Sequence, residues 1–167
     1  THNVSAYTMK NGIIARYSDD GEPQGTSGMP TLDAIRKSGV DNACVVITRY
    51  FGGTLLGTGG LVRAYAGATK EGLSASKVIT KMHGQKISIQ TDYTGLGKIQ
   101  YILGQRGLNI LNSIYTDKVE LEVLLPEHVI GEVMAEIREG TNGQAKMELQ
   151  EECYFANIDG EMQIFED

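Results

Sequence analysis

Three carboxylates lie close together in a polar loop near the start of the sequence, SDDGEPQGTSGMP at residues 18–30. Asp19, Asp20 and Glu22 offer the oxygen ligands that a hard cation such as Mg²⁺ or Ca²⁺ prefers. They also suit a turn in which aspartate side chains accept backbone N–H groups and glycine supplies a positive φ. A polar binding surface is a third interpretation. We favour the turn, predict no metal site, and define this signature loop by Asp19, Asp20, Glu22, Gly25, Thr26, Ser27 and Gly28.

A second loop, RYFGGTLLGTGGLVR at residues 49–63, has the composition of an anion-binding site. We expect a strand before it and a helix after it, and its glycines let N–H groups at the helix start approach a ligand. The spacing is neither that of a P-loop nor that of a dinucleotide-binding fingerprint. Close packing of helix against strand explains the glycines about as well. The candidates for binding phosphate or nucleic acid are Arg49, Tyr50, Gly57, Thr58, Gly59, Gly60 and Arg63.

No residue pattern predicts nucleophilic or acid–base catalysis. His2, His83 and His128 have no partner in a known motif. Cys44 falls in an apolar run typical of a buried strand, so we expect a structural thiol there. We therefore predict no catalytic residue and no cofactor, and we favour a protein without enzymatic activity.

The composition is that of a folded globular protein, with 41% hydrophobic and 22% charged residues among 167. No apolar run approaches the roughly 20 residues that span a bilayer, and two cysteines do not make a disulfide framework. These features exclude a membrane protein, a small secreted protein and a disordered chain, and they suit a cytoplasmic location. Residues 1–85 hold nine Lys and Arg against six Asp and Glu, whereas residues 86–167 hold six against fifteen. This asymmetry suggests two domains with different surfaces, and ordinary solvated surface charge explains it about as well.

The first domain, expected at residues 1–80, has the pattern of a small α/β domain. Asn11-Gly12 between two short apolar runs predicts a β-hairpin. The continuous apolar run ACVVIT predicts a strand buried on both faces, and the helix after the second loop should begin at Gly59 or Gly60. The expected strands are 4–7, 13–17 and 43–48, and the expected helices are 31–38 and 61–76.

The second domain, expected at residues 86–157, shows the order β-α-β-β-α-β that is typical of a ferredoxin-like fold. A C-terminal tail is expected at residues 158–167. The expected strands are 86–91, 108–115, 118–125, 146–150 and 153–156, and the expected helices are 93–106 and 126–138.

Taken together, SDDGEPQGTSGMP and VVITRYFGGTLLGTGGLVRAYAGA resemble the signature of the IMPACT/YigZ family, also called UPF0029. The second half resembles the small C-terminal domain of bacterial members. The resemblance implies an α+β protein of two domains. The first would be an α/β sandwich similar to domain IV of elongation factor G and to GHMP kinases, with a left-handed crossover, and the second would be similar to domain V of that factor. Family members begin with a further α/β segment, so we expect that the sequence, which starts at Thr1, lacks a native N-terminal segment.

The leading functional hypothesis is a non-enzymatic binding protein associated with translation or RNA, whose basic glycine-rich loop contacts the phosphate backbone. Its expected partner is RNA or the ribosome, with no membrane and no specificity for a DNA sequence. One alternative is a binder of a phosphate-containing small molecule, or an enzyme, that uses the DDGEP and GTGG loops. Another is a regulator of translation that acts through a protein partner. Convergence of Asp19, Asp20 and Glu22 on the helix start at residues 57–60 would favour the small molecule.

Overall fold

The computed structural model describes residues 1–165, and the chain divides into two compact units. Unit 1 comprises residues 1–78, and unit 2 begins at Ile79. Each unit has its own sheet, and the described residues contain four α-helices, which confirms the α+β class. No helix in this part of the chain is both long and apolar enough to cross a membrane.

Unit 1 contains a three-stranded antiparallel sheet with the strand order β2-β1-β3. The predicted hairpin is present, and Lys10, Asn11 and Gly12 all adopt positive φ at its turn. The unit consists of β1 (His2–Met9), β2 (Ile14–Ser18), α1 (Gly28–Ser38), β3 (Ala43–Arg49) and α2 (Gly57–Ala75).

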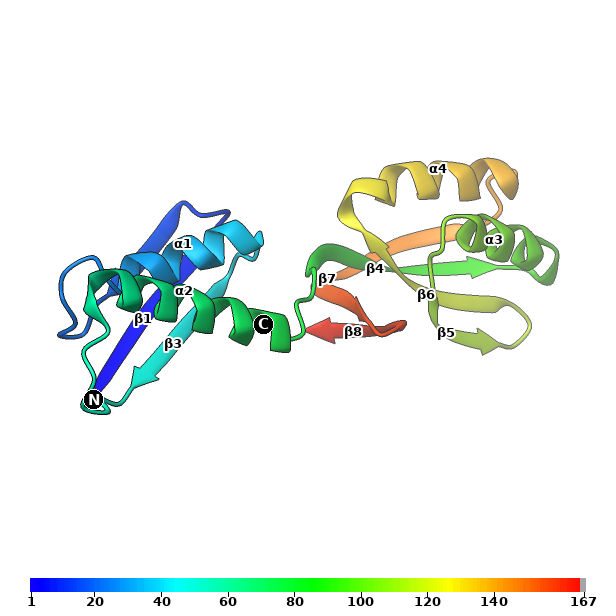
Figure 1. Cartoon of the computed structure of the whole chain (residues 1–167). Coiled ribbons are helices and arrows are strands. Elements are labelled where there is room, and N and C mark those ends of the chain that lie inside the picture. Colours follow the sequence, from blue (N-terminus) through cyan, green and yellow to red (C-terminus); the bar gives the residue numbers. More distant parts are fainter. Residues whose placement is uncertain (166–167) are drawn as a thin grey trace. The chain divides into compact units, whose positions relative to one another are not determined.

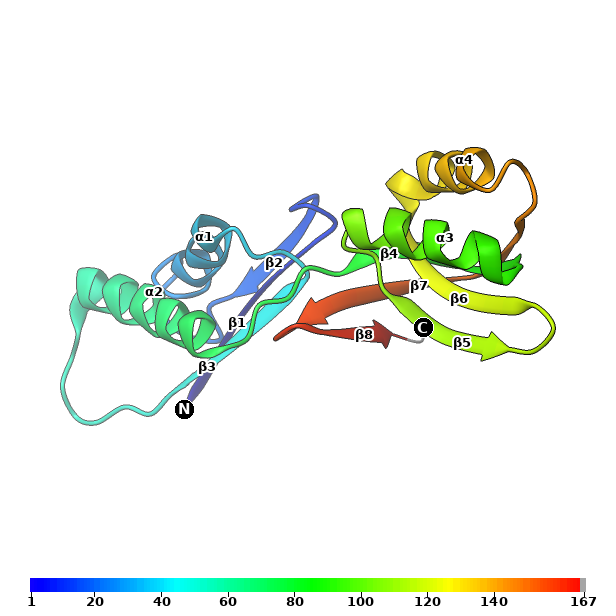
Figure 2. The ribbon, with the colours of Figure 1, turned by 90° about the vertical axis from the view of Figure 1, so that its right-hand side faces the viewer.

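Both helices of unit 1 cover the same face of its sheet (Figures 1 and 2). Every second residue of β1 from Val4 to Thr8 is buried on that face. Val4 packs in a cluster with two residues of α2, and Ala6 packs in a cluster with two residues of α1. The central strand therefore holds the two helices in place.

The prediction that the strand 43–48 is buried on both faces is wrong. In β3 every second residue is exposed, and these residues are Cys44, Val46 and Thr48. The strand lies at the edge of a sheet that carries helices on one face only, so its apolar run has a covered side and an open side. Cys44 is consequently an exposed thiol and not a buried structural one.

Unit 2 follows the order β-α-β-β-α-β and adds one further strand. Its five strands form an antiparallel sheet in the order β5-β6-β4-β7-β8. The unit consists of β4 (Met82–Thr91), α3 (Tyr93–Gln105), β5 (Ile110–Tyr115), β6 (Val119–Pro126), the 3₁₀ helix η1 (Glu127–Val129), α4 (Ile130–Gly140), β7 (Lys146–Ile158) and β8 (Glu161–Phe165).

The core of unit 2 lies between its sheet and the two helices α3 and α4, which cover one face of it (Figures 1 and 2). Ile99 and Leu103 of α3 and Val133 and Ile137 of α4 pack against strand residues such as Ile87. All five side chains are at most 1% exposed. This core contains no residue of unit 1.

Two features at the C-terminal end differ from the expectation. β7 is one strand of 13 residues rather than two short strands. Residues 161–165, expected to belong to a tail, form β8 and pair with β7, while residues 166 and 167 lie outside the described part. Asp159 and Gly160 both adopt positive φ between the two strands. Asp-Gly favours such a hairpin turn, and the prediction of a tail did not use this signal.

We expect the two cysteines to react at different rates with a thiol reagent such as DTNB. Cys44 is exposed, whereas burial raises the pKa of the Cys153 thiol above its ordinary value. The native protein should therefore show one fast and one slow phase of absorbance change. Cys44→Ser should abolish the fast phase, and loss of the slow phase instead would contradict the assignment.

Candidate functional site

Glu22 is a buried carboxylate, and its side chain is only 2% exposed. Arg49, at the end of β3, donates two hydrogen bonds to it, at 2.5 Å from Nε and 2.9 Å from Nη2. The Tyr65 hydroxyl of α2 donates a third at 2.8 Å. The carboxylate therefore joins the signature loop, the end of β3 and the inner face of α2.

The protonation states in this cluster are fixed by its contacts. The hydrogen bonds from Arg49 lower the pKa of Glu22, against the opposing effect of burial. Burial, together with the hydrogen bond to Glu22, raises the pKa of Tyr65 to about 12. Near neutral pH the carboxylate is ionised and is a weak base, while the phenol keeps its proton. The cluster is thus suited to holding the chain in place rather than to transferring a proton.

Asp19 holds the start of α1. Its carboxylate accepts backbone N–H groups of Gly25 at 2.9 Å, Ser27 at 3.2 Å and Gly28 at 2.8 Å. Ser27 occupies the N-cap position, but its side chain makes no capping hydrogen bond. Asp19 takes over that role from the preceding loop, and its negative charge at the helix N-terminus adds to the stability of α1.

Asp20 points elsewhere and ties the loop to β1. Its carboxylate accepts the backbone N–H of Asn3 at 2.6 Å, and its carbonyl is 2.8 Å from Nδ1 of His2. The three carboxylates of the DDGEP segment therefore do not converge. Among residues 1–165, no group of His, Cys, Asp and Glu side chains is placed to hold a metal ion.

The remaining signature residues close the loop upon itself. Thr26 donates its hydroxyl to the Pro23 carbonyl at 2.6 Å and lies 3.1 Å from the Ser27 hydroxyl. At Gly28 an added Cβ would lie 2.9 Å from the Ser18 carbonyl oxygen, so a larger residue does not fit. Most polar groups of the loop are thus used within the fold, as the structural-turn interpretation expects.

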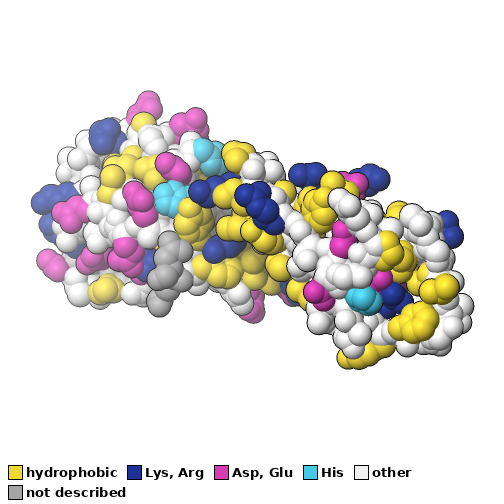
Figure 3. All heavy atoms as spheres, turned by 90° about the vertical axis from the view of Figure 1, so that its left-hand side faces the viewer, with side chains coloured by type: hydrophobic (Ala, Val, Ile, Leu, Met, Phe, Trp, Pro, Cys, Tyr) yellow, Lys and Arg dark blue, Asp and Glu magenta, His cyan; other side chains and the backbone are white. Residues whose placement is uncertain are grey.

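The second loop, predicted at residues 49–63, lies between β3 and α2 only at residues 50–56. This loop 50–56 has the opposite character because its apolar side chains face solvent. Hydrophobic side chains appear at several places on the surface (Figure 3), and those of this loop are prominent, since Tyr50 is 77% and Leu55 is 87% exposed. Phe51 is exposed as well, and the Arg49 guanidinium carbon lies 6.0 Å from its ring centre. The loop therefore starts at a fixed residue and presents aromatic and aliphatic groups outward.

α2 begins at Gly57, so the prediction that Gly59 or Gly60 opens the helix is wrong by two or three residues. Gly57 adopts a φ of +71°, which turns the loop into the helix, and the two later glycines are already helical. No side chain caps this end. The first N–H groups of α2 consequently have no intrahelical partner and are available to an anion.

Arg63 lies beside this helix start, because a Cβ added at Gly59 would be 3.3 Å from an Nη atom of Arg63. The side chain is exposed, and it makes no hydrogen bond or ion pair with any residue from 1 to 165. Arg49 differs from it, since its charge is compensated by Glu22. Of the two arginines named from the sequence, Arg63 is the one with a free guanidinium.

A cavity of about 300 Å³ connects several of these residues. It is lined by Glu22, Arg49, Gly57 and Thr58 together with apolar residues of the loop, Phe51, Leu55, Leu56 and Leu61 among them. Of the three signature carboxylates, only Glu22 reaches it. The structure thus brings together part of each predicted residue group. Outside the cavity it leaves the other two carboxylates and, of the candidates for phosphate or nucleic-acid binding, Tyr50, Gly59, Gly60 and Arg63.

Tyr65 was missed by the sequence reasoning. Its spacing on the helix indicates a core residue, which it is, at 1% exposure. A buried tyrosine hydroxyl nevertheless requires a hydrogen-bond partner, so the core position of Tyr65 on the helix was the only signal in the sequence, and it does not identify Glu22 as that partner.

Replacing Glu22 by Gln should destabilise unit 1. The amide lacks the charge that Arg49 faces and leaves buried donors poorly paired, which we expect to cost about 1–3 kcal/mol of unfolding free energy. Urea unfolding followed by circular dichroism measures the change. Glu71→Gln is the matched control, because Glu71 is exposed on α2 and has no hydrogen bond or ion pair within residues 1–165. Equal effects of the two substitutions would contradict a structural role for Glu22.

The same cluster should make stability depend on pH. Because the folded pKa of Glu22 lies below its ordinary value of 4.5, its contribution to stability is complete above that value and is lost as pH falls through the folded pKa. The wild-type protein should lose unfolding free energy on acidification, and Glu22→Gln should show a smaller loss over the same range. An unchanged pH dependence in the variant would overturn this assignment.

Comparison with known proteins agrees with the two-unit division of the chain. Residues 1–73 match the Impact N-terminal domain, and residues 89–144 match a domain of unknown function, DUF1949. A solved structure described as a crystal structure of a hypothetical protein is 35% identical, with a TM-score of 0.50, and the match covers 90% of this chain and 74% of that one.

Curated relatives carry the family name. The IMPACT family member YvyE of Bacillus subtilis is 37% identical over 155 residues, which are 92% of this chain and 71% of the relative. The IMPACT family member YigZ of Escherichia coli is 39% identical over 131 residues, which are 78% of this chain and 64% of the relative, just under two thirds of its length. The signature loop and loop 50–56 both lie within the matched Impact domain. The chain therefore belongs to the IMPACT family.

Proposed function

We propose that this protein is a non-enzymatic binding protein that holds single-stranded RNA of the translation apparatus on loop 50–56 and the start of α2. The observation that carries the proposal is the exposure of two aromatic rings, Tyr50 and Phe51, in the loop that leads into an uncapped helix N-terminus with a free arginine, Arg63. Membership of the IMPACT family, a family related to the regulation of translation, supports the choice of partner.

The two kinds of group have complementary tasks in RNA binding. Aromatic faces stack on unpaired bases without regard to sequence. N–H groups at a helix start and an arginine bind phosphate oxygens and set the position of the strand. Phe51, Gly57 and Thr58 line one cavity, so a stacking group and the helix start belong to one continuous surface. In this proposal Arg49 has a positioning role, because it is held by Glu22.

Binding should be weak and without base specificity. The first half of the sequence has only three more basic than acidic residues, and the second half has nine more acidic than basic ones. We therefore expect an affinity in the micromolar range or weaker, with a clear dependence on salt through counterion release. We further propose that the two units are similar to domains IV and V of elongation factor G and that the protein is located in the cytoplasm.

A second candidate is a phosphate-containing small molecule in the cavity beside Glu22 and Arg49. Its volume of about 300 Å³ is at the lower end of the range found for ligand pockets. The separation of Asp19 and Asp20 from this cavity argues against a phosphate–metal site of the kind that many phosphate-using enzymes have. Thermal-shift measurements with inorganic phosphate and ATP test this candidate.

Fluorescence anisotropy of a labelled oligouridine of about 12 nucleotides tests RNA binding on the full chain, since single-strand sites span roughly 4–16 nucleotides.

Tyr50→Ala should weaken binding about tenfold through the loss of stacking. Arg63→Glu should weaken it at least about fivefold at low salt and reduce the salt dependence. Arg138→Glu, the same charge reversal on the exposed face of α4, is the matched control and should weaken binding less than twofold. Equal binding by all variants, or none by the wild type, would contradict the proposal.

A further inference from the structure

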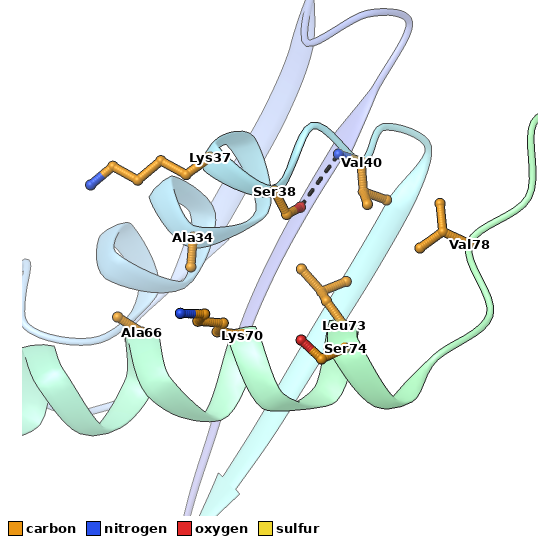
Figure 4. Close-up of a pocket in the computed structure, with 9 residues that line it drawn as sticks. All are labelled: Ala34, Lys37, Ser38, Val40, Ala66, Lys70, Leu73, Ser74 and Val78. Atoms are coloured by element: carbon orange, nitrogen blue, oxygen red, sulfur yellow. Dashed lines mark hydrogen bonds between the residues drawn. The ribbon is translucent and has the colours of Figure 1, made fainter.

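Unit 1 also contains a groove between α1 and the C-terminal half of α2, with a volume of about 610 Å³ (Figure 4). It shares no lining residue with the cavity beside Glu22. Its α2 residues run from Ala66 to Ser74, a span of about 12 Å, or a little more than two helical turns. The RNA surface proposed above does not use this groove.

Small residues face each other across the groove and leave space between the two helices. Ala34 of α1 and Ala66 of α2 point toward one another from the facing helices (Figure 4). Leu73, Val40 and Val78 add larger apolar groups at the end away from the start of α2. Val78 is 58% exposed and the other four side chains are only partly buried. An apolar floor thus remains open between the helices.

The rim of the groove is basic. Lys37 stands on α1 and Lys70 on α2, and neither forms a hydrogen bond or ion pair with any residue in the range 1–165. No acidic residue lines the groove. Of the two serines, Ser38 is of less use to a ligand, since its hydroxyl donates to the Ile35 carbonyl at 2.6 Å and accepts the Val40 N–H at 3.3 Å, whereas Ser74 keeps a neutral hydroxyl at the rim. The free polar groups at the rim are therefore chiefly two positive charges, one on each side.

We propose that this groove binds an amphipathic helix with an acidic polar face, supplied by a partner protein. A helix can lay apolar residues at i, i+3 or i+4, and i+7 along a floor of this length. Acidic residues that flank the apolar stripe would face the lysine on either side. The alanines let the partner backbone come close to both helices, while the aliphatic stems of the lysines can lie along the apolar surface.

The test uses the full chain and a labelled synthetic peptide of about four helical turns, with leucine at i, i+3, i+7 and i+10 and glutamate beside this stripe. A second peptide carries lysine in place of every glutamate. Fluorescence anisotropy at low salt should detect binding of the acidic peptide and at least about tenfold weaker binding of the basic one, and added salt should reduce the difference.

Two pairs of variants locate the binding. Lys37→Glu combined with Lys70→Glu should weaken the acidic peptide at least about tenfold, whereas Arg36→Glu, a neighbour on α1 outside the groove, should change binding less than about twofold. Ala66→Met should fill the groove and weaken binding at least about fivefold. Ala68→Met, at an exposed position of the same helix that does not line the groove, should leave peptide binding unchanged. Circular dichroism of each variant verifies that it is folded.

Equal binding of the acidic and basic peptides would overturn the proposal, and so would equal binding by each variant and its control. Octanoate, an anionic amphiphile without a helix, is the remaining probe. Thermal stabilisation by octanoate without peptide binding would mean that the groove takes a small molecule, which also overturns it. Arg63→Glu should leave peptide binding unchanged, so a failure of the RNA proposal is distinguishable from a failure of this one.

Discussion

The carboxylate of Glu22 is the interaction on which the architecture of unit 1 depends. A buried charge is stable only when it is paired and its lone pairs are occupied, and Glu22 meets this requirement with two donors from Arg49 and one from Tyr65. The three residues belong to the signature loop, β3 and α2. Displacement of any one segment would therefore leave polar groups of the other two without their hydrogen-bond partners. Loop 50–56 is thereby held at both ends, although its own side chains point into solvent.

The signature loop and loop 50–56 consequently have different tasks. The first contains the residue types of a metal site, yet Asp19 and Asp20 each accept backbone N–H groups and hold α1 and β1. The carboxylates of this loop are therefore already paired with groups of the fold. The second has exposed aromatic and aliphatic groups and unpaired helix N–H groups, none of which the fold requires in these positions. A binding function is therefore better placed on the second loop, and the first determines how precisely that loop is presented.

Much of the fold could be predicted because the signals are local. Asn11-Gly12 indicates its hairpin through the turn geometry it prefers, and alternating or helical periodicity places the main strands and helices of unit 2. What failed depends on neighbours distant in sequence. Whether an apolar strand is covered on one face or two is decided by the number of layers, so β3 and its Cys44 were misjudged. The pairing of Glu22 with Tyr65 across 43 positions has no local signal at all.

The position of the two proposed surfaces on α2 separates their electrostatics. At the start of the 19-residue helix the macrodipole and the free N–H groups favour an anion even without side chains. The groove lies along the C-terminal halves of α1 and α2, where the same dipole disfavours negative charge. An acidic ligand there can be attracted only by side chains, and Lys37 and Lys70 are the unpaired basic groups that line the groove. The helix start can therefore bind phosphate through the backbone, with Arg63 adding to it, whereas the groove's preference for acidic partners depends wholly on its lysines.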